Sequence, residues 1–319
     1  MDIYVVRVNP GRPDNKTLNK NDFLLFITNF QTMVKQQPFA TIDFHVTCEC
    51  SQECPYCWGP QDIENPVLTS TSKRIIRKIK DIGARRIVFT GGDPLSRKDI
   101  GSLIRYAKEI GLEVALSTTG DKITPTFLRW NASYIDLISL PIDGSTEAIN
   151  SQTKEKEHLA AVLNTLDMLR KYPNIDVKVC TPVTKYNIKD IPNILNLSER
   201  YKKKTKARVF YNIFQTFPRS LGKVEWEELI VSDKDFVALK RKLSGRKKIK
   251  VNFLDHKTLD NLYLMIFPNG NLVIPVGENF TSFGPFLEID DISEVLKKSK
   301  FDSQKHLKHS RGWGRKSGE

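Results

Sequence analysis

Four of the five cysteines of the chain lie within ten residues of one another, in the segment CECSQECPYC from Cys48 to Cys57. Three chemistries fit this spacing. Cys54 and Cys57 form a C-x2-C pair that resembles a glutaredoxin-type redox dithiol. All four cysteines could chelate zinc, which normally takes four closed ligands. Cys50, Cys54 and Cys57, spaced C-x3-C-x2-C, could instead hold an iron–sulfur cluster.

The surrounding residues favour the iron–sulfur interpretation. The next helix is expected near residue 72, so Cys54 lacks the helix N-terminus that lowers the pKa of a redox dithiol. Cys48 lies two residues before Cys50, so the four cysteines do not form the two Cys-x2-Cys knuckles that a structural zinc site normally uses, which disfavours a four-cysteine zinc site. Three thiolates would leave one iron of a four-iron cluster open, and a catalytic metal keeps such a position for its ligand.

Strand-like and helical segments alternate through the region that must position this loop. We expect strands at 40–47, 85–90, 112–118, 134–142, 175–183 and 207–214, and helices at 72–83 (with Ser72 as its cap), 99–110, 124–130, 157–171 and 188–201. This alternation predicts an α/β fold of parallel units with the helices outside. Six units are fewer than the eight of a full barrel, so we predict a partial (β/α)6 barrel.

The loops that follow the strands should converge on one rim, because chemistry in parallel β/α folds lies at the C-terminal ends of the strands. These loops are the cysteine loop, GGDP at 91–94, STTG at 117–120 and PIDGS at 141–145. We expect three regions in the chain: an N-terminal extension over 1–38, a core domain over 39–215, and a small α+β C-terminal cap over 216–319. The cap shows a hairpin signal at Asn269-Gly270.

Composition sets broad limits on function. The chain has 319 residues and a formal net charge of +13, with basic runs at 202–208, 245–250 and 305–316. This charge fits nucleic acid, an anionic peptide, a phosphorylated substrate or simple solubility. The clustered, odd-numbered cysteines are not a disulfide framework. We see no secretory signal at the N-terminus and no apolar run long enough for a membrane helix, so we expect a cytoplasmic protein.

The cysteine motif and a correctly spaced GGDP together resemble the radical S-adenosylmethionine (radical SAM) superfamily over residues 40–215. FTGGDPLSRKDI is similar to the corresponding stretch of the molybdenum-cofactor cyclising enzyme and its relatives, with Asp93 where Glu is commoner. ISLPIDGSTEAIN resembles the fourth strand of that family.

The resemblance implies the cofactors. One [4Fe-4S] cluster would be held by Cys50, Cys54 and Cys57, and its open iron would bind the amino and carboxylate groups of S-adenosylmethionine. Reductive cleavage would yield a 5′-deoxyadenosyl radical that abstracts hydrogen from the substrate. The resemblance also implies S-adenosylmethionine contacts near the methionine end, the ribose and the adenine, from Gly91, Gly92, Asp93, Ser117, Thr118, Ser139, Thr181 and Tyr56.

Other reactive side chains receive structural interpretations. We expect Cys48 to be a thiol packed at the end of the first strand. Cys180 should be a small buried hydrophobe, the alternative being a hydrogen-atom donor inside the barrel. We expect His45 to be a satisfied polar core residue, and His306 and His309 in the tail to be solvated.

The C-terminal region resembles the SPASM-type extension of peptide-modifying members, which opens with P-x-G-x-h-x-x-C (h apolar). Here the hairpin reads FPNGNLVIPV, Val276 occupies the cysteine position, and no cysteine follows Cys180. A second cluster is therefore not expected. The substrate would be a peptide or a small metabolite, with flavodoxin or ferredoxin as reductant. The alternatives are an RNA-modifying radical SAM enzyme, supported only by the basic second half, or a non-enzymatic zinc or iron–sulfur protein that binds nucleic acid.

Overall fold

The structure is a computed structural model that describes residues 39–60, 63, 66–218, 226–245 and 248–311. The extension expected over 1–38 and the end of the basic tail lie outside the described residues. The described residues group into one compact unit.

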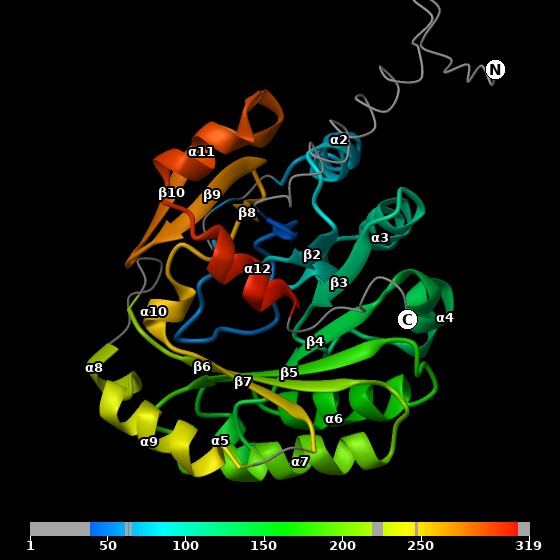
Figure 1. Cartoon of the computed structure of the whole chain (residues 1–319). Helices are drawn as coiled ribbons and strands as arrows, with labels where there is room; N and C mark the ends of the chain where they lie inside the picture. The colour runs from blue at the N-terminus through cyan, green and yellow to red at the C-terminus, as the bar shows by residue number, and fades with distance from the viewer. Residues whose placement is uncertain (1–38, 61–62, 64–65, 219–225, 246–247, 312–319) are drawn as a thin grey trace, which may run out of the picture. The chain divides into compact units, whose positions relative to one another are not determined.

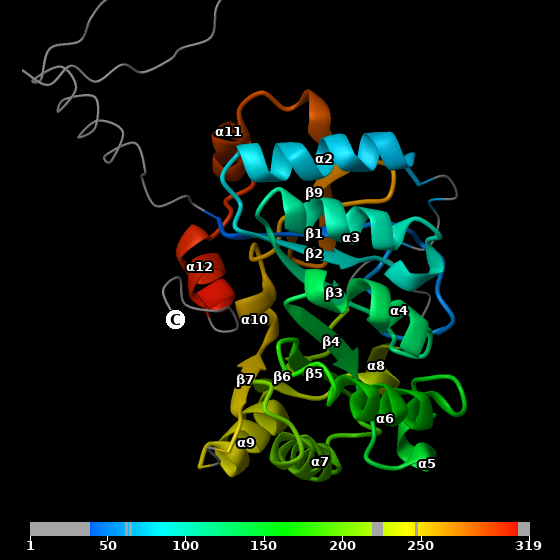
Figure 2. The same cartoon turned by 90° about the vertical axis from the view of Figure 1, so that its right-hand side faces the viewer.

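Six parallel strands form the centre of the sheet in sequence order. Five main helices alternate with them on the outer face, as Figures 1 and 2 show. The predicted partial barrel is confirmed. The strands are β1 (Thr41–His45), β2 (Arg86–Thr90), β3 (Glu113–Ser117), β4 (Leu137–Pro141), β5 (Asp176–Val183) and β6 (Val209–Gln215), and the helices are α2 (Thr69–Asp81), α3 (Ile100–Glu109), α4 (Pro125–Asn131), α6 (His158–Leu169) and α7 (Ile191–Lys203).

The segment after residue 215 extends both edges of this sheet. β7 (Lys250–Leu254) pairs parallel with β6, and β8 (Met265–Ile266) pairs parallel with β1. β9 (Asn271–Val276) and β10 (Asn279–Pro285) continue beyond β8 as antiparallel strands. The domain boundary at residue 215 stays a prediction, and segments from both sides of it share one sheet. The remaining helices here are α8 (Trp226–Leu229), α9 (Asp233–Leu243), α10 (His256–Leu259), α11 (Ile292–Lys298) and α12 (Ser303–Arg311), and a short α5 (Glu147–Asn150) follows β4.

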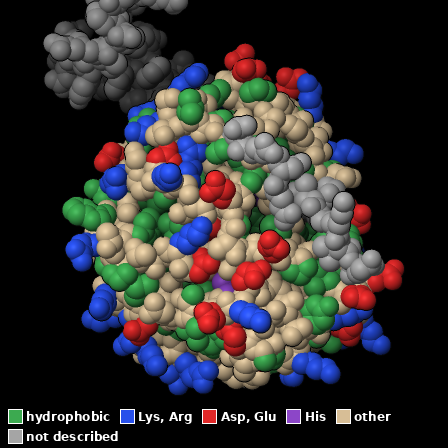
Figure 3. Space-filling model, turned by 180° about the vertical axis from the view of Figure 1, so that it is seen from behind, with side chains coloured by type: hydrophobic (Ala, Val, Ile, Leu, Met, Phe, Trp, Pro, Cys, Tyr) green, Lys and Arg blue, Asp and Glu red, His purple; other side chains and the backbone are tan. Residues whose placement is uncertain are grey.

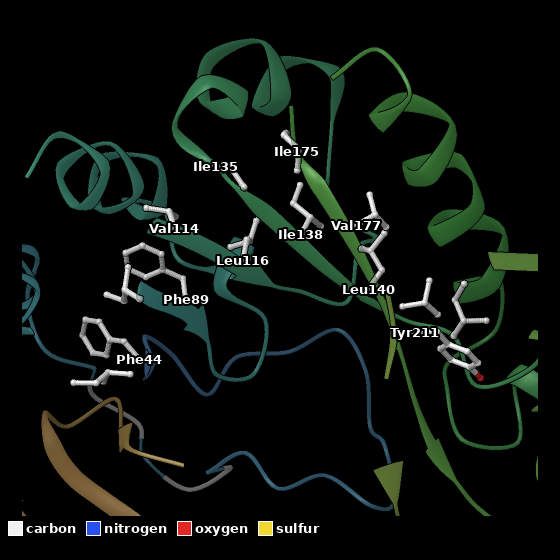
Figure 4. Close-up of a cluster of buried hydrophobic side chains, with 14 of the residues drawn as sticks. Phe44, Phe89, Val114, Leu116, Ile135, Ile138, Leu140, Ile175, Val177 and Tyr211 are labelled. Atoms are coloured by element: carbon white, nitrogen blue, oxygen red, sulfur yellow. The ribbon is translucent and has the colours of Figure 1, made fainter. Parts of the chain in front are cut away.

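The core lies between the sheet and the outer helices. Alternate strand residues point to opposite faces, so Ile42 and Phe44 pack outward while Asp43 and His45 line a cavity inside the barrel. The outward set in Figure 4 forms one continuous layer. Burying each large apolar side chain contributes about 1.5–3 kcal/mol, which is why this layer specifies the barrel. Its labelled members are Phe44, Phe89, Val114, Leu116, Ile135, Ile138, Leu140, Ile175, Val177 and Tyr211.

The start of the first core helix differs from the prediction. α2 begins at Thr69, and Ser72 lies fully buried in its first turn, where its backbone N–H donates to the Leu68 carbonyl. The hydroxyl made Ser72 resemble a cap, but this face of the helix points into the protein. The expected cap is therefore wrong.

Helix α12 corrects the expectation of a solvated tail. The His306 side chain is 4% exposed, and its Nε2 accepts hydrogen bonds from the backbone N–H groups of Ala40 (3.0 Å) and Thr41 (3.2 Å). The Arg86 guanidinium donates to the Ser310 carbonyl at 3.2 Å. α12 therefore lies against the N-terminal ends of β1 and β2, and Figure 1 shows it in front of the strands. Among the described helices, none is both long and apolar enough to cross a membrane.

Candidate active site

The cysteine loop follows the C-terminal end of β1, and residues 46–60 contain no helix or strand. Cys50 is exposed, whereas Cys54 and Cys57 are half-buried. All three line one cavity of about 350 Å³ inside the barrel. The motif cysteines thus share one space, as expected for ligands of one cofactor.

The glycine pair after β2 allows the cysteine loop to pack closely. A Cβ on Gly91, which has a φ of +134°, would lie 2.3 Å from the Thr47 carbonyl oxygen, and one on Gly92 would lie 2.3 Å from that of Cys48. The Gly92 N–H donates to the Thr47 carbonyl at 2.8 Å. Both positions need glycine because backbone fills the space that a side chain would take. Both glycines also line the cavity. Their contact with S-adenosylmethionine stays a prediction.

Two polar side chains hold the exposed part of the loop. The Asp121 carboxylate, after β3, accepts hydrogen bonds from the Ser51 hydroxyl (2.6 Å) and the Gln52 amide (3.1 Å). The carbonyl oxygen of the same Gln52 amide accepts the backbone N–H of Glu155 at 3.1 Å. These bonds tie the loop to two other rim segments, and we did not predict them from the sequence.

A buried lysine lies beside the second motif cysteine. Lys154 Nζ is 2.9 Å from Cys54 Sγ, 4.0 Å from the Asp143 carboxylate and 5.3 Å from the centre of the Tyr56 ring. Although burial favours the neutral amine, Asp143 and Cys54 raise the pKa of Lys154, which keeps it charged. The Tyr56 hydroxyl donates to Asp143, which fixes the ring in the cavity wall. The contact of Tyr56 with adenine stays a prediction.

The thiols do not have the properties of a redox dithiol. Burial raises the pKa of Cys50 to about 11 and also raises the pKa of Cys54, in spite of the nearby Lys154 charge. Glutaredoxin-type cysteines need the opposite shift. In the described part of the chain no three His, Cys, Asp or Glu side chains are grouped closely enough to hold a single metal ion. A cluster spreads its thiolates over several irons and supplies the positive charge that ionises them, so these residues fit it.

Two of the proposed cofactor residues do not reach the cavity. Asp93 is fully buried, and its carboxylate accepts hydrogen bonds from Thr118 (2.6 Å), Thr119 (3.2 Å) and the Leu95 N–H (3.3 Å). The Thr181 hydroxyl is also buried and donates to the Ile142 carbonyl at 2.5 Å. Neither residue lines the cavity in this structure, so their direct contact with S-adenosylmethionine remains an untested prediction.

The other strand-end residues do face the cavity. Ser117, Thr118 and Ser139 line it, and Ser139 Oγ lies 3.2 Å from Cys180 Sγ. Cys180 is half-buried and faces the barrel interior, so the expectation of a buried hydrophobe is wrong. His45 also lines the cavity, and its Nδ1 has no hydrogen-bond partner, so it is not the satisfied core residue expected.

Comparison with known proteins decides the family. The model of the radical SAM superfamily matches residues 44–198, which include the end of β1, the cysteine loop, the glycine pair and β2 to β5. The chain is a member of the radical SAM superfamily. It is therefore an enzyme, and the cofactors of its family are a [4Fe-4S] cluster and S-adenosylmethionine. The more specific SPASM-type assignment stays a prediction.

Two relatives cover most of the chain, and both are named S-adenosylmethionine-dependent nucleotide dehydratase. The protein from Lacinutrix mariniflava is 25% identical and aligns with 92% of this chain, which spans 63% of that relative's length. The protein from Flammeovirga pacifica is 27% identical over 78% of this chain and 87% of its own length. The AdoMet-dependent heme synthase of Nitratidesulfovibrio vulgaris is 30% identical over 56% of this chain, which spans about half (48%) of that relative.

Solved structures agree in fold. SuiB of Streptococcus suis, bound to its precursor peptide SuiA, matches with a TM-score of 0.64 over 97% of this chain and 76% of that chain. The anSMEcpe enzyme with bound AdoMet matches with a TM-score of 0.63 over 83% and 82%. Identities are 15% and 12%, so these comparisons describe the fold alone.

Proposed function

We propose that this radical SAM enzyme acts on a small molecule held inside the barrel. Cys50, Cys54 and Cys57 would be the cluster ligands, and Ser117, Thr118 and Ser139 would line the cofactor side of the cavity. When bound, the cluster and S-adenosylmethionine would supply the radical chemistry of the family, which removes a hydrogen atom from the substrate. Lys154 would hold the Cys54 thiolate in place through its 2.9 Å contact.

The shape of the cavity is the observation that carries this proposal. The same cavity is lined by the cysteines at one end and by Thr41, His306 and Ser310 at the other. Helix α12 thus forms part of the wall at the N-terminal ends of the strands. Because S-adenosylmethionine and the substrate would share this one cavity of about 350 Å³, the space favours a small molecule as substrate. The names of the two nucleotide dehydratases favour a nucleotide within this class.

Peptide and RNA substrates have weaker support. The similarity to SuiB with its bound peptide is a similarity of fold alone. For RNA, a continuous basic surface would be expected. On the face in Figure 3, the described lysine and arginine side chains gather mainly towards the edges and mix with acidic side chains over the centre. A cytoplasmic location and a flavodoxin or ferredoxin reductant stay predictions.

The test is an anaerobic reconstitution followed by iron analysis and a 5′-deoxyadenosine assay with dithionite. Cys54→Ser should lose cluster iron and nucleoside release, whereas Cys180→Ser should keep about four irons per chain. Pools of nucleotides, small metabolites and peptides would then be compared for stimulation of 5′-deoxyadenosine release. Stimulation only by peptides or RNA would refute the small-molecule proposal. Full iron binding by Cys54→Ser would refute the ligand assignment.

A further inference from the structure

Three residues that line the cavity each carry a buried side-chain atom without a hydrogen-bond partner. These atoms are His45 Nδ1, Asn212 Nδ2 and Thr216 Oγ1, in residues that are 7%, 0% and 5% exposed. A buried polar group without a partner costs about 1–3 kcal/mol, so such atoms are expected to gain partners from a ligand. The cofactor contacts implied by the family resemblance use none of them.

The orientation of these groups defines what they can bind. The Asn212 carbonyl oxygen accepts a hydrogen bond from the Asn252 amide at 2.8 Å, so the Asn212 amide N–H group remains as a donor. Burial lowers the pKa of His45 to about 4, so the ring is neutral near pH 7 and Nδ1 can donate or accept according to its tautomer. The Thr216 hydroxyl can also do either. This set matches a ligand edge that carries both donors and acceptors.

Aromatic side chains line the same cavity. Trp58, Phe214 and Tyr263 are half-buried around the apolar cluster of Leu254, Leu259 and Leu262. The Trp58 and Tyr263 rings lie 6.4 Å apart at 82°. Trp58 directly follows the cluster ligand proposed at Cys57, so this aromatic group lies next to the cysteine loop. Aromatic side chains of this kind contact the faces of planar rings.

We propose that these residues form a recognition wall for a nitrogen heterocycle, the base of a nucleoside or nucleotide. The aromatic group contacts the ring, and the three polar residues bond its edge. We call this surface the base wall; it comprises His45, Trp58, Asn212, Phe214, Thr216 and Tyr263. The inference rests on the proposed function, because it places the substrate of that reaction inside the barrel.

The test measures binding without turnover, on cluster-loaded anaerobic protein to which no reductant is added. The probes are adenosine, guanosine, cytidine, uridine and their 5′-triphosphates, with ribose 5-phosphate and tripolyphosphate as controls. Calorimetry gives the affinity, and tryptophan fluorescence reports on Trp58. Trp58→Phe should abolish the fluorescence change, while Trp130→Phe, at a residue 64% exposed on α4, should keep it.

Variants at the polar edge give the decisive comparison. Asn212→Leu should weaken binding of the preferred nucleoside by about tenfold or more, since a buried hydrogen bond is lost. Asn212→Asp keeps the size of the side chain and removes the donor, so it should also weaken binding if Asn212→Leu does not fold. Asn164→Leu, at an exposed position on α6, should leave affinity unchanged.

Three outcomes would overturn the base wall. The first is that no nucleoside binds, and the second is that only tripolyphosphate and the triphosphates bind. The third is that adenosine alone binds and S-adenosylmethionine displaces it, which would assign the wall to the adenine of the cofactor. A separate reaction with dithionite reports 5′-deoxyadenosine release. If 5′-deoxyadenosine is released but one of these three binding outcomes is found, the base wall is refuted and the proposed radical chemistry stands. If no substrate gives release of 5′-deoxyadenosine, the proposed function is refuted.

Discussion

Acidification should loosen the contact between α12 and the sheet through His306. In the neutral ring, Nε2 accepts hydrogen bonds from two backbone N–H groups, and the Nδ1–H group donates to the Leu262 carbonyl at 2.8 Å. Protonation of Nε2 would remove its lone pair and turn two attractive contacts into repulsive ones. Burial and the nearby Arg86 charge lower the pKa of His306 to about 4, although the Leu262 carbonyl opposes this.

The direction and size of the effect follow from that pKa. In the unfolded chain the ring takes up its proton near pH 6.5, so the unfolded state binds more protons between about pH 6.5 and 4. The contribution of His306 is therefore fully present above pH 6.5 and is lost as the pH falls towards 4. A pKa lowered from 6.5 to about 4 corresponds to about 3 kcal/mol. The charged and titratable groups nearby are Arg86 on β2 and His309 on α12.

The assay is urea unfolding of cluster-loaded protein under anaerobic conditions at several values between pH 7.5 and 4.5. Wild type and His306→Gln should differ most at pH 7.5, and the difference should shrink by up to about 3 kcal/mol at the acid end. His256→Gln, in the short helix α10 and only half-buried, is the matched control and should not change the pH slope comparably. A difference between wild type and His306→Gln that stays constant with pH would refute the argument.

Three further changes test the site. Gly92→Ala should lower the free energy of unfolding by about 1–3 kcal/mol and reduce bound iron, because the new Cβ would lie 2.3 Å from the Cys48 carbonyl oxygen. Urea unfolding measures the first effect and iron analysis the second. Lys154→Met should lower the cluster reduction potential by about 60 mV, since a positive charge and an N–H···S contact are lost, and Lys154→Arg should restore part of it. A spectroscopic redox titration measures both potentials, and an unchanged potential would contradict the proposed contact of Lys154 with the Cys54 thiolate. Thr118→Val should destabilise the protein by about 1–3 kcal/mol in urea, because the buried Asp93 carboxylate loses a partner, whereas Ser117→Ala should cost less.

Local patterns in the sequence predicted the parts of this protein that depend on local geometry. The alternation in β1 separates outward Ile42 and Phe44 from inward Asp43 and His45, and each core strand begins and ends within about three residues of the expected limits. The cysteine spacing and the glycine pair are likewise short-range patterns, and the structure brings them together because both follow neighbouring strands.

Contacts between distant segments could not be predicted in the same way. Lys154 lies 100 residues after Cys54, and nothing in its surroundings distinguishes it from the many exposed lysines. His306 was interpreted as solvated because it lies in a basic tail, but its partners are the backbone of residues 40 and 41. Asp93 lies in the expected loop after β2, yet the hydroxyl groups of Thr118 and Thr119 decide where its carboxylate points.

The C-terminal segment provides structure where a complete barrel would have two more units. β7 and β8 add one parallel strand to each edge of the six-stranded core. Eight parallel strands therefore lie around the cavity, in the order β8, β1 to β6 and β7. Tyr263 and Leu264 before β8, and His306 and Ser310 in α12, line the cavity itself. The segment contains no cysteine. Its side chains thus shape the cavity in which we propose that the substrate binds. We expect differences in this segment to set substrate choice while the cysteine loop keeps the common chemistry.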